Sequence, residues 1–404
     1  MFGSLRIWNY RVWAGGALVS NVGTWMQRVA QDWLVLAILT RHNASAVGVV
    51  MALQFGPQLL LLPWSGYAAD RFDRRKLLIA TQAALGLLAL GLGLVTIAGV
   101  VTLWQVYAFA LLLGCVSAFD APVRQVFVNE LVGDEHLANA VALNSTSFNA
   151  ARMIGPAVAG LLIAAVGCGW VFLINAASFA GVLASLAMLR VDQLHDGERK
   201  VRRVDGLAEG FRYVWRRPDL MAVLVMLFLI GTFGLNFPIF ISTMSLTAFH
   251  GGAGKYGLLT SAFAVGSVGG ALYSAYRSQP GMGVLCAASA VFGAGCLLAA
   301  LAPDEGLFAA ALVLTGLAAL VFATGTNSLM QLTTAPAMRG RVMALRLAVA
   351  MGGTPLGAPV VGWIADHFGP RWALGVGAAS GLAAMLVALR YMGGLRMRAA
   401  EAGA

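Results

Sequence analysis

The feature that most constrains this chain is a succession of twelve long apolar runs separated by short polar or charged gaps. A bilayer core of about 30 Å takes about 20 helical residues, so each run fits one crossing. Only 11% of the residues are charged, against about 25% in a typical soluble domain. The sequence therefore predicts an all-α membrane fold of twelve transmembrane helices. The runs lie near residues 13–39, 45–69, 76–99, 103–128, 138–166, 169–190, 220–246, 255–276, 282–302, 306–331, 342–365 and 371–392.

The basic residues lie in the gaps between the runs, mostly on one side of the predicted membrane. A net charge of +10 on one solvated face would suggest a nucleic-acid partner, but this distribution indicates membrane topology. Lys and Arg concentrate on the cytoplasmic side of membrane proteins. If the N-terminus is cytoplasmic, the opposite side holds only Arg41, Lys255 and Arg371. We therefore expect a multi-pass protein of a bacterial-type cytoplasmic (inner) membrane, with both termini in the cytoplasm.

The chain divides into two similar halves around its one long polar segment. GPAVAGLLIAAVGCGW in the fifth run aligns without a gap with GAPVVGWIADHFGPRW in the eleventh, which places Gly160 on Gly362. A weaker match places Gly48 on Gly257. Repeats of this kind occur in secondary transporters with a midplane site. We expect an N-terminal six-helix bundle (1–190), a cytoplasmic linker with an amphipathic helix (191–218), and a C-terminal six-helix bundle with a short cytoplasmic tail (219–404).

The second part of the linker, residues 206–217, has an amphipathic pattern. Phe211, Val214 and Trp215 recur at helical spacing opposite charged side chains, and Pro218 ends the pattern. This favours a helix that lies along the inner leaflet of the membrane. A regulatory or nucleic-acid role for its basic residues is the less favoured alternative.

Five charged residues lie inside the predicted spans, all in the first half: Arg28, Asp32, Asp120, Arg124 and Arg152. Each Asp has an Arg four residues away, so the two side chains share a helix face and can form an ion pair. Such pairs either fix helix packing or take part in proton coupling, because burial disfavours a charged carboxylate and a nearby Arg favours it. A third interpretation places Asp120, Arg124 and Arg152 near the cytoplasmic interface. Asp32 is the first candidate proton carrier and Asp120 the second, with the three arginines as their cationic partners.

Amide side chains recur in several spans and suit a water-filled cavity. Intramembrane amides also join helices through hydrogen bonds, which is the alternative interpretation. The candidates for a cavity lining are Gln27 and Gln31 in the first span, Asn236 in the seventh and Asn327 in the tenth.

Two short segments carry more information than a turn or a span requires. GYAADRFDRRK, residues 66–76, is a charged turn, and a purely topological role is one interpretation because cytoplasmic turns collect Arg and Lys. ARMIGPAVAG, residues 151–160, contains a Pro that removes a backbone hydrogen bond and Gly residues that remove side-chain bulk. It predicts a bend and a close helix approach, or simple packing with a kink.

These segments resemble the major facilitator superfamily, in particular its branch of enterobactin-exporter and macrolide-efflux-like proteins. The resemblance covers nearly the whole chain, through SNVGTWMQRVAQDWLVLAILT, NELVGDEHLANAVALNSTSFNAARMIGPAVAGLLI, GLAEGFRYVWRRPDL, RGRVMAL and the 66–76 loop. It implies that this loop latches the cytoplasmic side and holds the outward-open state, with the acid at the N-terminal dipole of the eleventh helix. The implied latch residues are Gly66, Asp70, Arg71, Arg74 and Arg75.

The resemblance also assigns the fifth-span segment. Gly155, Pro156 and Gly160 match a motif shared by antiporters in the superfamily. Two positions depart from the family pattern: Asp73 stands where the loop usually has Gly, and Ala110 stands where many drug antiporters have an Arg in the fourth span.

Together the resemblance and the intramembrane charges predict a secondary active transporter. We expect it to export a small amphipathic molecule, of the drug or siderophore type, by proton antiport and alternating access. The alternatives are uptake or facilitated diffusion, and a non-transporting membrane sensor. We expect no enzyme activity, because no His cluster, metal-ligand spacing, phosphate loop or nucleophile pattern is present in the sequence. The expected partners are the substrate, protons and the lipid bilayer, with no cofactor, metal or nucleic acid and a monomeric chain.

Overall fold

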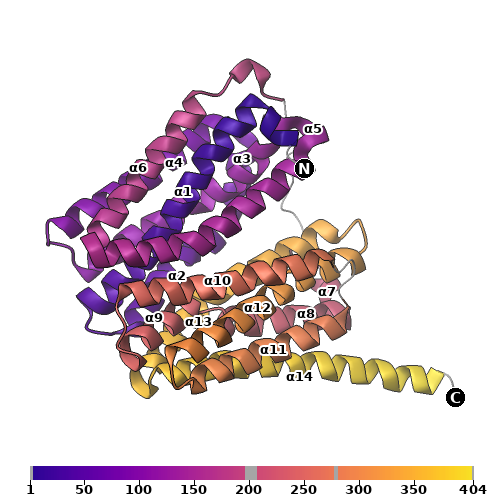
Figure 1. The fold of residues 1–404 in the computed structure, drawn as a ribbon. Helices are drawn as coiled ribbons and strands as arrows, with labels where there is room; N and C mark the ends of the chain where they lie inside the picture. The colour runs from indigo at the N-terminus through magenta and orange to yellow at the C-terminus, as the bar shows by residue number, and fades with distance from the viewer. Residues whose placement is uncertain (1–2, 196–206, 277–280, 403–404) are drawn as a thin grey trace. The chain divides into compact units, whose positions relative to one another are not determined.

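The chain is almost wholly helical (Figure 1). A computed structural model describes residues 3–195, 207–276 and 281–402, and these ranges contain no β-strand. The side chains of Asp70 and of a few other residues within them lie outside this description. The helices form two compact units. The N-terminal unit contains Met1–Arg41, Leu53–Arg203 and Gly251–Ser261, and the C-terminal unit contains His42–Ala52, Val204–His250 and Ala262–Ala404.

The helices follow the predicted spans in order. Ten of those in the described ranges are long and apolar enough to cross a membrane. The first and second spans differ: α1 has a polar face and continues as a π-helical segment, Leu34–Leu39, whereas the second span is divided at Leu61 into α2 and α3. The bounds are α1 (Trp8–Trp33), α2 (Ala44–Leu60), α3 (Leu62–Arg71), α4 (Arg74–Ile97), α5 (Leu103–Val166), α6 (Cys168–Ala187), α7 (Leu207–Trp215), α8 (Pro218–Leu229), α9 (Phe237–Thr243), α10 (Ala253–Tyr276), α11 (Met282–Leu301), α12 (Glu305–Thr333), α13 (Arg339–Phe368) and α14 (Pro370–Ala402).

Helix α5 contains both the fourth and the fifth predicted span. The two spans meet at Gly133, whose φ of 68° and ψ of 177° are not helical. Only glycine adopts such a backbone conformation readily, since a Cβ would be strained there. Gly133 thus turns the chain from one crossing into the next without a loop.

The seventh predicted span is a broken helix. Helix α8 passes into a π-helical segment, Ile230–Gly234, and α9 then begins after Asn236 with Pro238 in its first turn. Proline fits a first turn because its missing N–H would have no helical acceptor. The Asn236 side chain donates to the Thr232 carbonyl oxygen at 2.8 Å and so gives that carbonyl a side-chain donor where the helix is interrupted.

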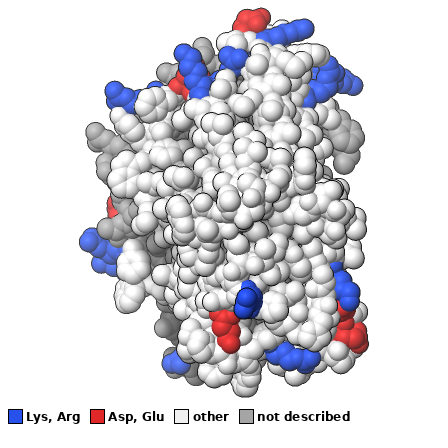
Figure 2. All heavy atoms as spheres, turned by 90° about the vertical axis from the view of Figure 1, so that its left-hand side faces the viewer, with Lys and Arg blue, Asp and Glu red and all other residues white. Residues whose placement is uncertain are grey.

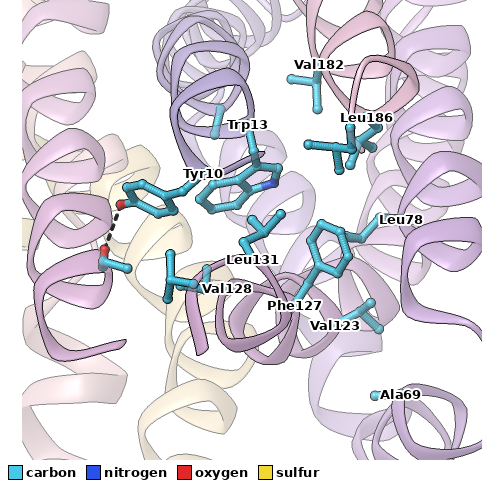
Figure 3. Close-up of a cluster of buried hydrophobic side chains, with 14 residues drawn as sticks. Tyr10, Trp13, Ala69, Leu78, Val123, Phe127, Val128, Leu131, Val182 and Leu186 are labelled. Atoms are coloured by element: carbon cyan, nitrogen blue, oxygen red, sulfur yellow. Dashed lines mark hydrogen bonds between the residues drawn. The ribbon is translucent and has the colours of Figure 1, made fainter. Parts of the chain in front are cut away.

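A buried aromatic and aliphatic cluster holds five helices of the N-terminal unit together, α1, α3, α4, α5 and α6 (Figure 3). Tyr10 and Trp13 of α1 lie against Phe127 of α5, with Leu78 of α4 and Leu186 of α6 beside them. The Tyr10 hydroxyl donates to the Ala140 carbonyl oxygen at 2.9 Å, and Ala140 follows the turn of α5 at Gly133. A buried Tyr hydroxyl needs such a partner. This core therefore also fixes the second half of α5.

Few charged side chains appear on the face that Figure 2 presents, which is the left-hand side of Figure 1. Those visible lie mainly toward the two ends of the view, and a broad zone of uncharged side chains separates them. Helix ends that meet lipid headgroups and water accept charge, whereas the hydrocarbon core does not. Charge is thus sparse on this face, in line with the ten apolar helices that are long enough to cross a membrane in the described ranges.

The predicted amphipathic helix of the linker is α7, and residues 196–206 before it lie outside the described part. Val214 is fully buried, whereas Phe211 and Trp215 are 48% and 69% exposed. Their rings lie 5.7 Å apart. Glu209 of α7 pairs with Arg341 of α13 at 3.3 Å. Helix α7 is therefore held on α13 with two aromatic side chains facing outward.

Two helix starts pack against other helices through glycine. A Cβ on Gly362 of α13 would lie 2.6 Å from the Ala44 carbonyl oxygen at the start of α2, and a Cβ on Gly160 of α5 would lie 2.7 Å from that of Ala253 at the start of α10. Only a residue without a side chain allows so close an approach. We call these contacts the α2/α13 junction, in the C-terminal unit, and the α10/α5 junction, in the N-terminal unit.

Candidate functional site

A polar cavity of about 420 Å³ opens within the N-terminal unit. Helix α1 presents Asn21, Thr24, Arg28 and Gln31 to it at intervals of three or four residues, so one helix face supplies one wall. Amides dominate the lining, whereas most small-molecule pockets are mainly apolar. The lining amides are Asn21, Gln27, Gln31, Gln54, Gln58, Gln125, Asn144, Asn149 and Asn175.

The cavity thus contains two of the four predicted lining residues, Gln27 and Gln31. Gln27 accepts a hydrogen bond from Asn175 of α6. Gln31 is 1% exposed, and its Nε2 has no hydrogen-bond partner among the described residues. The other two, Asn236 and Asn327, belong to the C-terminal unit.

Asp120 joins three helices at the wall of the cavity. One carboxylate oxygen accepts from Thr81 Oγ1 at 2.8 Å and from Gln82 Nε2 at 2.6 Å, both on α4. The other accepts from Arg124 at 2.9 Å, as the i, i+4 spacing predicts. Arg124 also donates to Asn21 of α1 at 3.3 Å. Each donor compensates part of the cost of burying a carboxylate that is only 6% exposed.

Asp32 has a different environment. Its side chain is buried and accepts from the Tyr256 hydroxyl at 3.0 Å. Tyr256 lies in the first turn of α10, fully buried, with its ring stacked on that of Trp33 at 6.2 Å. The α10/α5 junction brings Tyr256 to this place, since Gly257 is the residue that packs on Pro156 and Gly160.

Arg28 does not make the ion pair with Asp32 that its spacing would allow. Its guanidinium lies over the rings of Trp25 and Phe55, 4.8 and 5.7 Å from their centroids. Arg152 lies 5.9 Å from the same Trp25 ring. Aromatic faces attract a guanidinium but carry no charge that neutralises it.

The fifth-span segment packs against both α1 and α10. A Cβ on Gly155 would lie 2.7 Å from Trp25 Cβ on α1. On α10, a Cβ on Gly257 would lie 2.3 Å from the Pro156 carbonyl oxygen, and Ser261 Oγ donates to the Met153 carbonyl oxygen at 2.7 Å. The segment thus occupies a position where any side chain at its glycines would separate helices.

The basic loop between α3 and α4 is bonded within the N-terminal unit. Arg74 forms an ion pair with Glu130 of α5 at 2.6 Å and is 7% exposed. Arg75 donates to the Leu186 carbonyl oxygen near the end of α6, at 2.9 and 3.1 Å. These bonds hold the start of α4 to two neighbouring helices.

The remaining loop residues have more local contacts. Arg71 donates to Tyr67 Oη at 2.8 Å. Asp73 caps α4, since its carboxylate accepts from the Lys76 amide at 3.0 Å. Within the N-terminal unit, a Cβ on Gly66 would meet no atom within 4 Å. The side chain of Asp70 lies outside the described part, so its predicted position at the eleventh helix stays a prediction.

Sequence reasoning missed two residues of the N-terminal unit that bear on the site and its loop. Tyr256 has no local signal, because its partner Asp32 lies in the other half of the sequence. Glu130, the partner of Arg74, lies 56 residues further along the chain, and nothing in the sequence around it indicates that pairing.

Comparison with known proteins identifies the family. Residues 2–402 match a family described as "Transmembrane secretion effector". The chain is 28% identical over 212 residues to the uncharacterized MFS-type transporter YfiS of Bacillus subtilis, and this match spans 51% of the chain and only 49% of that relative. It is 26% identical to the multidrug efflux pump Tap of Mycolicibacterium fortuitum, over 87% of the chain and 88% of Tap. It is also 26% identical to the enterobactin exporter EntS of Shigella flexneri, over 81% of the chain and 78% of EntS.

Solved structures agree on the fold. A bacterial homologue of the iron transporter ferroportin superposes with a TM-score of 0.74 at 17% identity, covering 96% of this chain and 98% of that one. A D-xylose-proton symporter superposes with a TM-score of 0.74 at 14% identity, covering 95% of this chain and 97% of that one. At such low identities the likeness concerns the fold alone, which is the twelve-helix fold of these transporters. The chain therefore belongs to the transmembrane secretion effector family of the major facilitator superfamily.

Proposed function

We propose that this transporter exports a small amphipathic molecule by alternating access, in exchange for protons. The observation that supports this most is the amide-rich cavity with charged residues in its wall, inside a membrane-spanning bundle. A dedicated passage for water and solute is a setting in which such polar groups are tolerated at membrane depth. EntS and Tap are described as an enterobactin exporter and a multidrug efflux pump, so siderophores and drugs are the substrate classes to test first.

Asp32 is the better candidate for the proton carrier. Asp120 accepts hydrogen bonds from three side chains on two helices, which suits a structural tie. Asp32 has one such donor, Tyr256, and Arg28 is one helical turn away without an ion pair between them. A carboxyl group with few bonds to rearrange is better suited to gain and lose a proton in each cycle.

The remaining parts of the proposal concern the frame around the cavity. Two six-helix bundles, 1–190 and 219–404, move relative to each other about the linker 191–218, and both termini lie in the cytoplasm. The 66–76 loop latches the cytoplasmic side through Asp70 and its arginines. The Gly155–Pro156–Gly160 motif favours antiport over uptake. The protein acts as a monomer in the cytoplasmic membrane.

The test is efflux into everted membrane vesicles with a panel of dyes, macrolides and siderophores, with and without a protonophore. We expect efflux of at least one of these compounds, abolished by the protonophore. Asp32→Asn abolishes the coupled efflux, whereas Asp120→Asn lowers the amount of folded protein. Proton release on substrate addition that persists in Asp32→Asn would refute the assignment, and protonophore-insensitive transport would refute antiport.

A further inference from the structure

The charges in the cavity wall are unequal in number. Arg28 and Arg124 line the cavity together with one acid, Asp120. Asp120 is paired with Arg124 at 2.9 Å. Asp32, one turn beyond Arg28 on α1, is not among the lining residues and is bonded to Tyr256. Among the described lining residues, Arg28 is thus the cation without a direct ion pair, and its one nearby acid, Asp32, acts on it only through space.

Two aromatic rings hold the Arg28 guanidinium in place, and the Asp32 carboxylate attracts it electrostatically from one turn further along α1 without an ion pair between them. The rings of Trp25 and Phe55 support the guanidinium at 4.8 and 5.7 Å. Stacking on a ring face leaves the N–H groups at the edge of the guanidinium plane available to an acceptor. A guanidinium held in this way is preorganised to meet an anionic oxygen, and less side-chain entropy is lost when it does so.

A second donor lies on the same face of α1. Gln31 is three residues after Arg28, lines the same cavity and is 1% exposed. Its Nε2 has no hydrogen-bond partner among the described residues. A buried donor without an acceptor costs free energy, so a ligand oxygen at this point would satisfy it.

We infer that Arg28 and Gln31 form a subsite for an anionic oxygen of the transported molecule, a carboxylate or a phenolate. This inference rests on the proposed export function and adds the charge class of the substrate to it. The guanidinium supplies the charge and orientation, and the Gln31 carboxamide supplies a neutral N–H on the same side. The remaining lining amides bind the hydroxyl and carbonyl groups of the same molecule.

The experiment measures equilibrium binding to the purified full-length protein in lipid nanodiscs. The probes are 2,3-dihydroxybenzoate and the uncharged 2,3-dihydroxybenzamide, which share a ring and differ in the carboxylate. We expect wild type to bind the benzoate about tenfold more tightly, since a hydrogen bond to a charged group is about twice as strong as a neutral one. Arg28→Gln brings the ratio of the two affinities to about one, and Arg28→Lys keeps part of the preference.

Arg11→Gln is the matched control. Arg11 also lies on α1 over a Trp ring, at 5.2 Å, but it is outside the cavity. We expect it to leave the ratio unchanged. Gln31→Met is the second variant: it weakens binding of both probes several-fold and keeps the preference for the anion. Thermal unfolding and size-exclusion chromatography establish that each variant is folded.

A preference that survives in Arg28→Gln overturns the inference, as does a wild-type ratio near one or the absence of saturable binding of either probe. These outcomes are separate from those of the efflux test. Protonophore-sensitive export in a protein without the anion preference removes the subsite alone. A protein with the preference but without coupled export removes the proposed function alone.

Discussion

The α2/α13 and α10/α5 junctions share one backbone geometry and differ in the polar contact beside it. In the first, Gly48 of α2 packs on α13, as a Cβ there would lie 2.4 Å from the Ala358 carbonyl oxygen. In the second, Gly257 of α10 packs on α5 in the same way. The repeat in the sequence aligns Gly48 with Gly257 and Gly160 with Gly362. The alignment of Gly48 with Gly257 also places Ala44, the first residue of α2, on Ala253, the first residue of α10.

The difference lies in the acid that each junction uses. At the α2/α13 junction, Asp366 accepts from the Ala44 and Ser45 amides at 2.6 and 2.8 Å and so caps α2. The position aligned with Asp366 in α5 is Ala164, which cannot do this. At the α10/α5 junction, Tyr256 reaches the buried Asp32 instead. One packing solution thus serves a helix cap in one unit and a contact to the candidate proton carrier in the other.

The largest effect is expected from closing the space at a junction glycine. Gly257→Ala places a Cβ against the Pro156 carbonyl oxygen and lowers the free energy of unfolding by up to about 3 kcal/mol, the usual range for overpacking. Gly254→Ala is the control, because a Cβ there meets no atom within 4 Å. Thermal unfolding in detergent measures both. Equal stability of the two variants would show that the close approach is unnecessary.

Removal of the Tyr256 hydroxyl comes next. Tyr256→Phe leaves a buried oxygen of Asp32 without its donor and lowers the free energy of unfolding by about 2 kcal/mol. We also expect reduced proton-coupled transport into everted vesicles. Tyr276→Phe, on the same helix and 93% exposed, is the control. A Tyr256→Phe protein with wild-type stability and wild-type efflux would make the two junctions equivalent in function.

Loss of the α2 cap has a smaller effect. Asp366→Ala removes the acceptor of two helix amides and costs about 1 kcal/mol, the typical value for a cap. The Asn43 side chain still caps the Ala46 amide at 2.9 Å, which limits the loss. Asp192→Ala, at another exposed acid, should leave the unfolding midpoint unchanged. We expect no change in the protonophore sensitivity of efflux, in contrast to Tyr256→Phe.

The smallest effect tests the equivalence of the two junctions directly. Ala164→Asp places an acid at the α5 position aligned with Asp366, opposite the first amides of α10. We expect a gain of about 0.5 kcal/mol, at the low end for a new cap. Ala165→Asp adds the same charge at the position aligned with His367 and should give no gain. A loss of stability in Ala164→Asp alone would indicate that the starts of α2 and α10 differ in geometry.

The fold could be predicted from the sequence because hydrophobic length is a local property. Each apolar run is long enough to indicate one membrane crossing without reference to the rest of the chain. The repeat that aligns Gly160 with Gly362 indicates that these two positions are equivalent, and both are junction glycines in the structure. The site was less predictable. Asp32, Asp120, Arg28 and Gln31 stand out as polar residues within apolar runs, but their partners depend on tertiary packing. The spacing of Arg28 and Asp32 allows an ion pair. In the structure, Arg28 instead lies over the rings of Trp25 and Phe55, and Asp32 instead accepts a hydrogen bond from the Tyr256 hydroxyl.

The cap at the start of α2 also bears on the order in which the protein is completed. The Ala44 and Ser45 amides donate to Asp366, which lies more than three hundred residues further along the chain. A ribosome adds residues from the N-terminus onward, so α2 enters the membrane long before Asp366 exists. Until then, Asn43 is the one side chain among the described residues that accepts from an amide of that first turn. The second crossing is therefore among the first to be synthesised and among the last to acquire all of its bonds.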